Sequence, residues 1–310
     1  MRALRLVASL AAALAGCGLG PGAEREGGAE LRVTRDFGRQ SIASRRVERV
    51  REDETVMRAL RSRFDVSTRF GGRFVQSIGG VSGRGPQGRS DWFYFVNGLE
   101  ASVGAAEYEL SPGDVVQWDY RRWDGAMRVP AIVGAYPEPF LHGAKGERFP
   151  VRVECADASS PACGRVKDRL RGDGVKASLS SFGAQGTRHV VRVVVAPWSR
   201  ARRLGTVAVL DEGPSASGVY ARFEDGGRRL ELLDEGGRPG RTEGAGAGLV
   251  AALAPGEDQV VWLVTGTDER GVGAAAATLR EHALRDAYAV AAGPGGVERL
   301  PVPGGEDREG

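Results

Sequence analysis

The chain has 310 residues, 27% of them charged, and a formal net charge of +3 at pH 7. This length suits two domains of about 100–150 residues once an N-terminal leader is subtracted. Arginines alternate with aspartates and glutamates along the chain, whereas nucleic-acid binding needs a basic stripe, so nucleic acid is not an expected partner.

The first sixteen residues, 1–16, have the pattern of a signal peptide. The basic segment Met1–Arg5 precedes the apolar run Leu6–Leu14, which is too short to span a bilayer. The run ends in Leu14-Ala15-Gly16-Cys17, which resembles a bacterial lipoprotein box. This resemblance implies cleavage before Cys17, lipidation of Cys17, and a place on the outer face of the bacterial cell membrane, because several acyl chains on one residue anchor stably. A plain secretory signal is the alternative.

Composition divides the remaining chain. Residues 17–29 are rich in Gly, Pro and charge and are expected to form a lipid-anchored flexible tether. Two domains are expected at residues 30–130 and 150–302. The Pro- and Gly-rich residues 131–149 would link them, with aromatic side chains able to pack on one domain. Residues 303–310 are expected to be a disordered tail.

Strand patterns dominate the first domain. Alternating apolar residues predict strands at Leu31–Phe37 and Arg46–Arg51. Thr55 can cap a helix whose apolar residues recur every four positions from Val56 to Phe64. Further strands are predicted at Asp65–Phe70, Phe74–Ile78, Trp92–Val96 and Val115–Tyr120, with Met127–Val133 as a last edge. A strand pair, one helix and a twisted set of strands indicate a β-grasp-like α+β domain.

The stretch Asp91–Trp123 is rich in aromatic residues. Asn97-Gly98 is a strong hairpin signal because both residues tolerate positive φ, and Pro112–Asp114 supplies a turn before the next strand. Alternation in that strand predicts a half-buried sheet. Val116, Trp118 and Tyr120 would share one face, and Gln117 and Asp119 the other.

A series of motifs runs through this domain: Thr55-Val56…Leu60, Gly72–Ile78, Trp92–Gly98, Gly104, Tyr108, Pro112–Asp114 and Trp118–Tyr120. In this order they resemble the transcobalamin-like C-terminal domain family, over residues 45–122. That family occurs in bacterial surface proteins and is similar to the small β-domain of transcobalamin and intrinsic factor. The resemblance implies a ligand-facing β-domain. The chain lacks the helical repeats of an α/α toroid, so it would supply a half-site.

A corrinoid needs aromatic faces and hydrogen-bonding amides around its apolar rim. The candidate ligand-binding residues of that type are Trp92, Tyr94, Asn97, Trp118, Tyr120, Arg121 and Trp123. The alternative is that Trp92, Tyr94 and Trp118 form core and Asn97 only forms the turn. Trp123 lies between two charged residues and is therefore the stronger candidate for contact with a ligand or partner.

Strand–helix alternation predicts a compact α/β sandwich for the second domain, with a parallel or mixed sheet. The apolar runs His189–Ala196 and Val260–Val264 indicate buried strands. Other strands are predicted at Val151–Cys155, Thr206–Leu210, Val219–Phe223, Leu230–Leu233 and Ala289–Ala292. Helices are predicted at Ala162–Leu170 and Gly271–Tyr288, and a hairpin around Asp225–Gly227.

Cys155 and Cys163 are left over once Cys17 is acylated, and an oxidising compartment favours a disulfide between them. No second cysteine pair completes a metal site, so no metal is expected. Gly271–Ala276 partly imitates a dinucleotide-binding motif. However, Thr265–Arg270 separates it from the preceding strand, and capping of an Ala-rich helix by Thr267 or Asp268 explains it better.

The sequence contains no recognisable catalytic constellation, so an enzyme is not expected and no cofactor is required. We therefore expect a membrane-anchored extracytoplasmic binding protein, with cobalamin or another corrinoid as the candidate ligand. Its partner would be a transporter component or an α/α-toroid protein. The alternative is a cell-envelope protein-interaction module that binds no small molecule.

Overall fold

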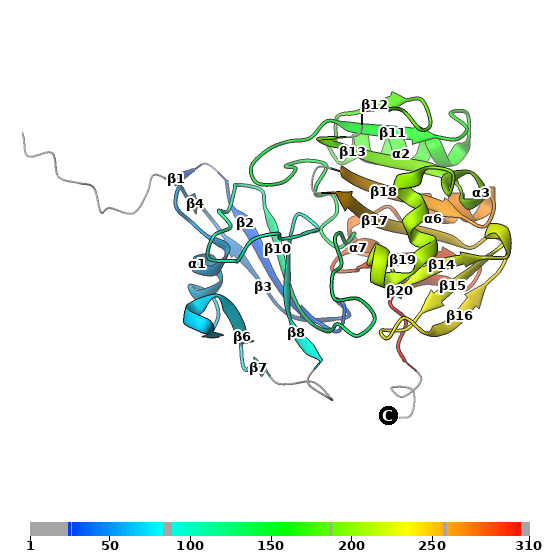
Figure 1. The fold of residues 1–310 in the computed structure, drawn as a ribbon. Helices are drawn as coiled ribbons and strands as arrows, with labels where there is room; N and C mark the ends of the chain where they lie inside the picture. The colour runs from blue at the N-terminus through cyan, green and yellow to red at the C-terminus, as the bar shows by residue number, and fades with distance from the viewer. Residues whose placement is uncertain (1–23, 26, 83–88, 187, 257–258, 305–310) are drawn as a thin grey trace, which may run out of the picture.

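The structure is a computed structural model that describes residues 24–25, 27–82, 89–186, 188–256 and 259–304. Strands and helices are mixed in several sheets, an α+β fold as the sequence predicts. An N-terminal unit, β1 to β10, lies beside a C-terminal unit, β11 to β20 (Figure 1). The expected signal peptide and Cys17 lie outside the described residues. No helix among the described residues is both long and apolar enough to cross a membrane.

A five-stranded sheet forms the centre of the N-terminal unit, in the order β3-β2-β10-β8-β9. Its strands are β2 (Ala29–Arg35), β3 (Gln40–Val47), β8 (Ser90–Val96), β9 (Leu99–Glu100) and β10 (Val115–Arg122). β10 pairs in parallel with β2 and antiparallel with β8, so the aromatic stretch is central to the sheet. The predicted hairpin is present, because Asn97 and Gly98 both have positive φ between β8 and β9.

Helix α1 (Val56–Arg61) packs on one face of this sheet and begins at the predicted cap, where the Thr55 hydroxyl accepts a hydrogen bond from the Arg58 N–H. The peripheral strands are β1 (Glu24–Arg25), β4 (Val50–Arg51), β5 (Val66–Arg69), β6 (Phe74–Ile78) and β7 (Val81–Ser82). The strand predicted at Arg46–Arg51 is divided between the end of β3 and β4. The last edge predicted at Met127–Val133 is wrong: this segment makes only an isolated bridge, between Ala131 and Leu99, and Pro130 within it lacks an N–H for a ladder.

The C-terminal unit is built on a seven-stranded mixed sheet, in the order β12-β11-β13-β18-β17-β19-β20. The strands are β11 (Val151–Cys155), β12 (Ala177–Ser180), β13 (Val190–Pro197), β17 (Gly248–Gly256), β18 (Gln259–Gly266), β19 (Ala289–Gly293) and β20 (Gly296–Leu300). The first four in sheet order are parallel, as the buried apolar runs predict.

Two different layers cover this sheet. Helices α2 (Pro161–Gly172) and α6 (Glu269–Thr278) pack on one face. The other face is covered by the small sheet of β14 (Ala221–Glu224), β15 (Arg229–Leu233) and β16 (Pro239–Glu243), together with α3 (Trp198–Ala201), α4 (Gly205–Ala208), η3 (Val209–Glu212) and α5 (Pro214–Ser217). The tight turn η4 (Asp225–Gly227) joins β14 to β15, as predicted.

Two predicted elements of this unit are wrong. Thr206–Leu210 is helical rather than extended: Val207 and Leu210 are three positions apart and both fully buried, which is a helical spacing. The long helix predicted over Gly271–Tyr288 ends at Thr278, whose hydroxyl donates to the carbonyl of Ala275 at 2.7 Å. A short separate helix, α7 (Glu281–Leu284), follows before β19.

Close backbone packing explains the first glycine of the partial dinucleotide motif. A Cβ at Gly271 would lie 2.1 Å from the carbonyl oxygen of Ala247, so α6 can approach the sheet only through glycine there. Asp268 caps the helix by accepting a hydrogen bond from the Gly271 N–H at 2.8 Å. The capping interpretation of this segment is confirmed.

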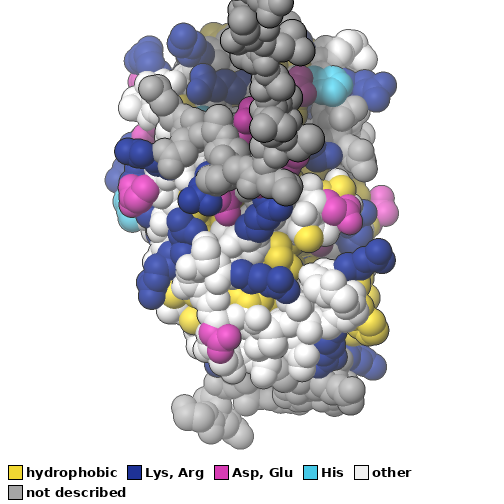
Figure 2. Space-filling view, turned by 90° about the vertical axis from the view of Figure 1, so that its left-hand side faces the viewer, with side chains coloured by type: hydrophobic (Ala, Val, Ile, Leu, Met, Phe, Trp, Pro, Cys, Tyr) yellow, Lys and Arg dark blue, Asp and Glu magenta, His cyan; other side chains and the backbone are white. Residues whose placement is uncertain are grey.

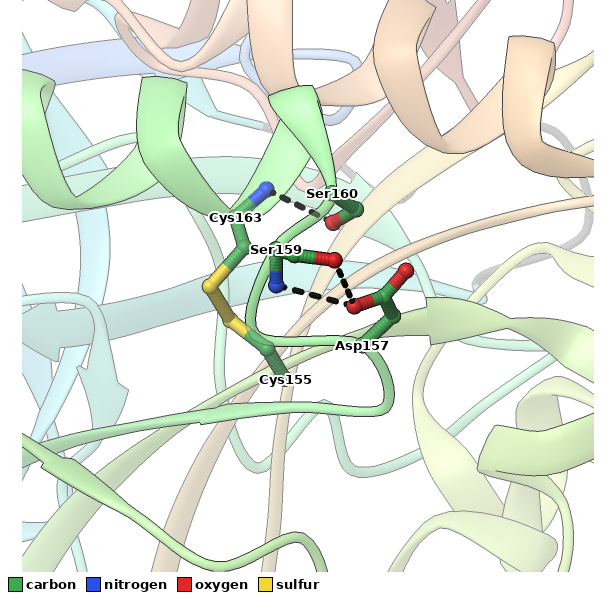
Figure 3. The surroundings of a disulfide bond; sticks show 5 residues. All are labelled: Cys155, Asp157, Ser159, Ser160 and Cys163. Carbon is green, nitrogen blue, oxygen red and sulfur yellow. Dashed lines mark hydrogen bonds between the residues drawn. A yellow bond between two sulfur atoms is a disulfide. The ribbon is translucent and has the colours of Figure 1, made fainter.

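The predicted disulfide is also confirmed. Cys155 ends β11 and Cys163 lies in the first turn of α2, with their Cα atoms 5.9 Å apart (Figure 3). Both cysteines are buried. Between them the Ser160 hydroxyl caps α2 by accepting from the Cys163 N–H at 3.2 Å, so the short loop is held at both ends.

Candidate functional site

The polar face of the central N-terminal sheet is buried against the C-terminal unit. Gln117 and Asp119 are 1% and 0% exposed, and Arg121 on the same face is 1% exposed. The sheet is therefore covered on both faces rather than one. The segment that covers this polar face, Asp286–Tyr288, lies between α7 and β19.

Asp119 is the centre of the contact between the two units. Its carboxylate accepts hydrogen bonds from the Thr34 hydroxyl at 2.7 Å, the Gly38 N–H at 3.1 Å and the Tyr288 hydroxyl at 2.9 Å. Burial raises the pKa of the Asp119 carboxyl, and these hydrogen bonds oppose that shift. Thr34 and Gly38 belong to the N-terminal unit, so the Tyr288 hydroxyl is the donor that joins Asp119 to the C-terminal unit.

Charged side chains extend this contact on either side. Arg32 donates to the carbonyl of Gly134 at 2.9 Å and lies 3.4 Å from a carboxylate oxygen of Asp286. Arg121 donates to the carbonyls of Ala126 and Met127 at 2.9 and 3.0 Å. Its guanidinium lies 3.8 Å from the centre of a phenylalanine ring of β8. Arg121 was predicted to bind a ligand, but its side chain is buried and contacts other residues of the protein.

Four of the predicted ligand residues lie together on the other face of the sheet. Tyr94 stacks on Trp118 at 4.8 Å between ring centroids, and Trp92 packs on Tyr120 at 5.3 Å. Trp92 and Trp118 are 9% and 3% exposed, and all four contribute to the core beneath α1. The two tryptophan rings are buried, and the half-buried rings of Tyr94 and Tyr120 each pack against one of them.

The remaining two predicted residues lie at opposite ends of the sheet. Trp123 follows β10 and is half-buried. Asn97 is fully buried in its turn, where its amide donates to Asp114 at 2.8 Å and to the carbonyl of Gly143 at 2.9 Å. Burial raises the pKa of the Asp114 carboxyl to about 6, although hydrogen bonds from the Ser111 N–H and Asn97 oppose the shift.

An open cleft of about 500 Å³ lies between the two units, next to the Asn97-Gly98 turn. Its volume falls within the range of small-molecule sites. The N-terminal unit contributes the end of β8, β9 and the residues after it. The C-terminal unit contributes α5, the start of β18 and the end of β17. Apolar side chains form part of both walls: Val96, Leu99, Ala101, Val209, Ala254 and Val260.

Polar groups stand at the rim of this cleft. Arg128 forms an ion pair with Glu100 at 3.0 Å. Lys145 is exposed, and its backbone N–H donates to the hydroxyl of Tyr108 at 3.2 Å. Burial raises the pKa of Tyr108, which keeps its phenol neutral. A cleft with apolar walls, an exposed lysine, an Arg128–Glu100 ion pair and a neutral phenol can hold a small amphipathic ligand that carries an anionic or amide group.

Sequence reasoning did not find this cleft, because its walls come from segments far apart in the chain. The single available signal was Lys145, one of three lysines in an arginine-rich chain. No group of three or more His, Cys, Asp and Glu side chains in the described part of the chain is placed to bind a metal ion.

One family model matches the chain. It is described as a domain of unknown function, DUF4430, and covers residues 53–122, which lie within the N-terminal unit. This range includes α1, β8 and β10, and all of the motifs on which the transcobalamin-like resemblance rests. The search of curated proteins found no match.

Proposed function

We propose that this chain is an extracytoplasmic binding protein that holds a small ligand in the cleft between its two units. Acyl chains on Cys17 would keep it on the outer face of the cell membrane, where it would pass the ligand to a transporter component or an α/α-toroid protein. The N-terminal unit would be β-grasp-like and related to the small β-domain of the cobalamin carriers.

The cleft is the observation that carries this proposal. Its two walls come from separate units that are joined by the hydrogen bond from Tyr288 to Asp119 and by the ion pair between Arg32 and Asp286, which supports a site that is formed before a ligand arrives. A preformed site saves the cost of ordering its walls on binding. Lys145 supplies positive charge at the cleft, where Arg128 is paired with Glu100, and this charge favours a ligand with anionic or polar groups.

A corrinoid remains our candidate ligand, bound along one edge. The core aromatics do not offer their faces, so the contact would come from the apolar walls of the cleft and the polar groups at its rim. A cleft of about 500 Å³ would cover such a broad ligand on one side only, which agrees with a half-site that a partner completes.

Titration calorimetry with cyanocobalamin tests this version, using the mature chain alone and together with candidate toroid or transporter proteins. We expect Lys145→Gln to weaken binding about tenfold, because a charge-assisted hydrogen bond contributes on the order of 1.5–3 kcal/mol. Lys176→Gln, exposed just before β12 and outside the cleft, is the matched control. Absence of heat in both settings would rule out the corrinoid.

The second candidate is a cell-envelope interaction module without a small ligand. The burial of Trp92 and Trp118 favours this candidate, because these aromatic side chains then stabilise the fold and do not contact a small ligand. Half-buried Trp123 would be its contact residue. Under this candidate Trp123→Ala loses partner proteins in a pull-down while Lys145→Gln retains them.

A further inference from the structure

Two phenylalanines project from the turn between β5 and β6. Phe70 is 77% exposed and Phe74 62% exposed, and their rings contact each other edge to face at 5.8 Å. They are the most exposed large apolar side chains in the described part of the chain. The turn itself is η1 (Phe70–Gly72), in which Phe70, Gly71 and Gly72 all have positive φ.

The fold contains a second turn of the same geometry that shows what this backbone requires. In η4, Asp225, Gly226 and Gly227 have φ of 53°, 65° and 97°, against 51°, 69° and 92° in η1. Aspartate tolerates positive φ well, whereas a bulky aromatic residue rarely adopts it. Local conformation therefore favours aspartate over phenylalanine in such a turn, and neither burial nor backbone geometry accounts for Phe70.

Arginines surround the exposed pair. Arg69 and Arg73 flank it in sequence and are exposed. Arg61, at the end of α1, lies beside the turn: its guanidinium donates to the Thr68 hydroxyl at 3.0 Å and is 3.6 Å from where a Cβ of Gly72 would lie. We call Phe70, Phe74 and these three arginines the Phe-Arg surface.

Positive charge continues from the Phe-Arg surface over this side of the N-terminal unit. Residues 45–73 contain nine arginines against five acidic residues, an excess of four. Arg49, Arg51, Arg58 and Arg63 line one shallow hollow beside α1, together with Asp53 and Glu54. Lys and Arg side chains are spread over the face seen in Figure 2, with Asp, Glu and apolar side chains between them.

The same side of the unit receives the chain from its N-terminus. Glu24 in β1 pairs with Arg51 in β4, and Arg51 lines the hollow just described. The seven residue steps from Cys17 to Glu24 reach at most about 25 Å. An acylated Cys17 would therefore hold this basic, aromatic side of the unit close to the bilayer.

We propose that the Phe-Arg surface docks on the anionic surface of a lipid bilayer, with Phe70 and Phe74 entering the head-group region and the arginines contacting lipid phosphates. Exposed aromatic side chains between cations are suited to the interface, because the rings leave water while the guanidinium groups remain with the phosphates. Two exposed apolar rings distinguish this surface from one that only attracts a soluble polyanion. The inference rests on the proposed function in one respect, that the bilayer is the one carrying the Cys17 acyl chains.

Vesicle sedimentation tests this proposal with the mature chain from residue 17 carrying Cys17→Ser, which has no acyl group and needs no cleft ligand. We expect binding to vesicles with about one third phosphatidylglycerol, and much weaker binding to pure phosphatidylcholine. Phe70→Asn with Phe74→Ser, which changes no charge, should weaken binding about 100-fold, at about tenfold for each ring withdrawn from the interface. Arg69→Gln with Arg73→Gln should lower it about 25-fold, at about fivefold each.

The controls lie on the C-terminal unit. Leu179→Ser with Val297→Ser removes two apolar side chains of 53% and 56% exposure and should leave binding unchanged. Asparagine tolerates positive φ as the aspartate of η4 does, so the turn should still form in Phe70→Asn. Hydrogen exchange of the unmutated chain adds a second readout: vesicles should slow exchange at residues 69–74.

The proposal is overturned if the unmutated chain does not bind anionic vesicles, or if the double phenylalanine variant binds as well as the unmutated chain. Complete displacement from vesicles by soluble polyphosphate, with no effect of the phenylalanine substitutions, would identify a polyanion site instead. None of these outcomes affects the cleft, which is tested by ligand titration.

Discussion

Removing one hydroxyl from the contact between the two units is the sharpest test of what holds them together. In Tyr288→Phe the ring remains, but Asp119 loses the donor that lies 2.9 Å from its carboxylate. Tyr288 is 2% exposed and Asp119 0% exposed, so water cannot replace the lost bond without opening the interface. A hydrogen bond to a buried charged group contributes about 1.5–3 kcal/mol, and we expect a loss of about 2 kcal/mol.

The matched control is Tyr220→Phe. Tyr220 is 1% exposed, and like Tyr288 it packs edge-on against Phe37 at 5.1 Å. Its hydroxyl has no hydrogen-bond partner among the described residues. Removing that hydroxyl should change stability by less than about 0.5 kcal/mol, or stabilise the protein slightly, because a buried unpaired polar group is unfavourable.

Differential scanning calorimetry measures both variants. A loss of about 2 kcal/mol should lower Tm by about 3 °C in a protein of this size, because the entropy of unfolding is about 2.1 cal/mol/K per residue, while Tyr220→Phe should leave Tm nearly unchanged. Equal shifts in the two variants would refute the view that the Asp119 contacts, rather than ring packing alone, hold the units together.

Three further predictions concern the C-terminal unit and the interface. Replacing both disulfide cysteines with alanine should lower the free energy of unfolding by about 2.5 kcal/mol, as expected for so short a loop, and a reductant should have no further effect on that variant in urea titrations. Gly271→Ala should be strongly destabilising, because its Cβ would lie 2.1 Å from a backbone oxygen. Gly273→Ala has open space around it and should stabilise α6 by up to about 1 kcal/mol. Thermal unfolding measures both variants, and equal changes in Tm would contradict this prediction. Burial raises the pKa of Glu30, but hydrogen bonds from Arg32 and other donors outweigh it and lower the pKa from 4.5 to about 2. A carboxyl group whose pKa is lower in the folded than in the unfolded protein stabilises the fold at pH values above the unfolded-state pKa. As the pH falls from about 4.5 to 2, the free energy of unfolding should therefore decrease by about 1–2 kcal/mol, after allowance for solvent screening. This decrease should be absent in Glu30→Gln.

Local sequence signals predicted much of the fold. Thr55 and Asp268 cap helices as expected, because a cap depends on residues three positions apart. The Asn97-Gly98 hairpin and the parallel strands of the C-terminal sheet follow from equally local patterns. The disulfide was predictable because only two cysteines remained to pair.

The features that were not predicted depend on weak local signals or on residues far away in the chain. Strand β17 was not predicted because its Gly- and Ala-rich run has low strand propensity, although residues 248–253 are all buried. Alternation correctly separated Gln117 and Asp119 from the aromatic face. It could not show that this polar face is buried, because the covering residues lie 169 positions away in the chain. The predicted ligand-binding residues do not form one site for the same reason: Arg121 lies on the buried polar face, and its burial could not be predicted from nearby residues.

The central claim is that the cleft between the units holds a small ligand. Native mass spectrometry of the protein extracted from its own membrane would measure the ligand it retains. Ala216, exposed on α5, lines the cleft, so Ala216→Trp should fill it, while Ala177→Trp places the same ring on the exposed edge strand β12. We predict a ligand-loaded species in the unmutated protein and in Ala177→Trp that is lost in Ala216→Trp. Equal loading of both variants, or no retained ligand in any of the three proteins, would contradict the account.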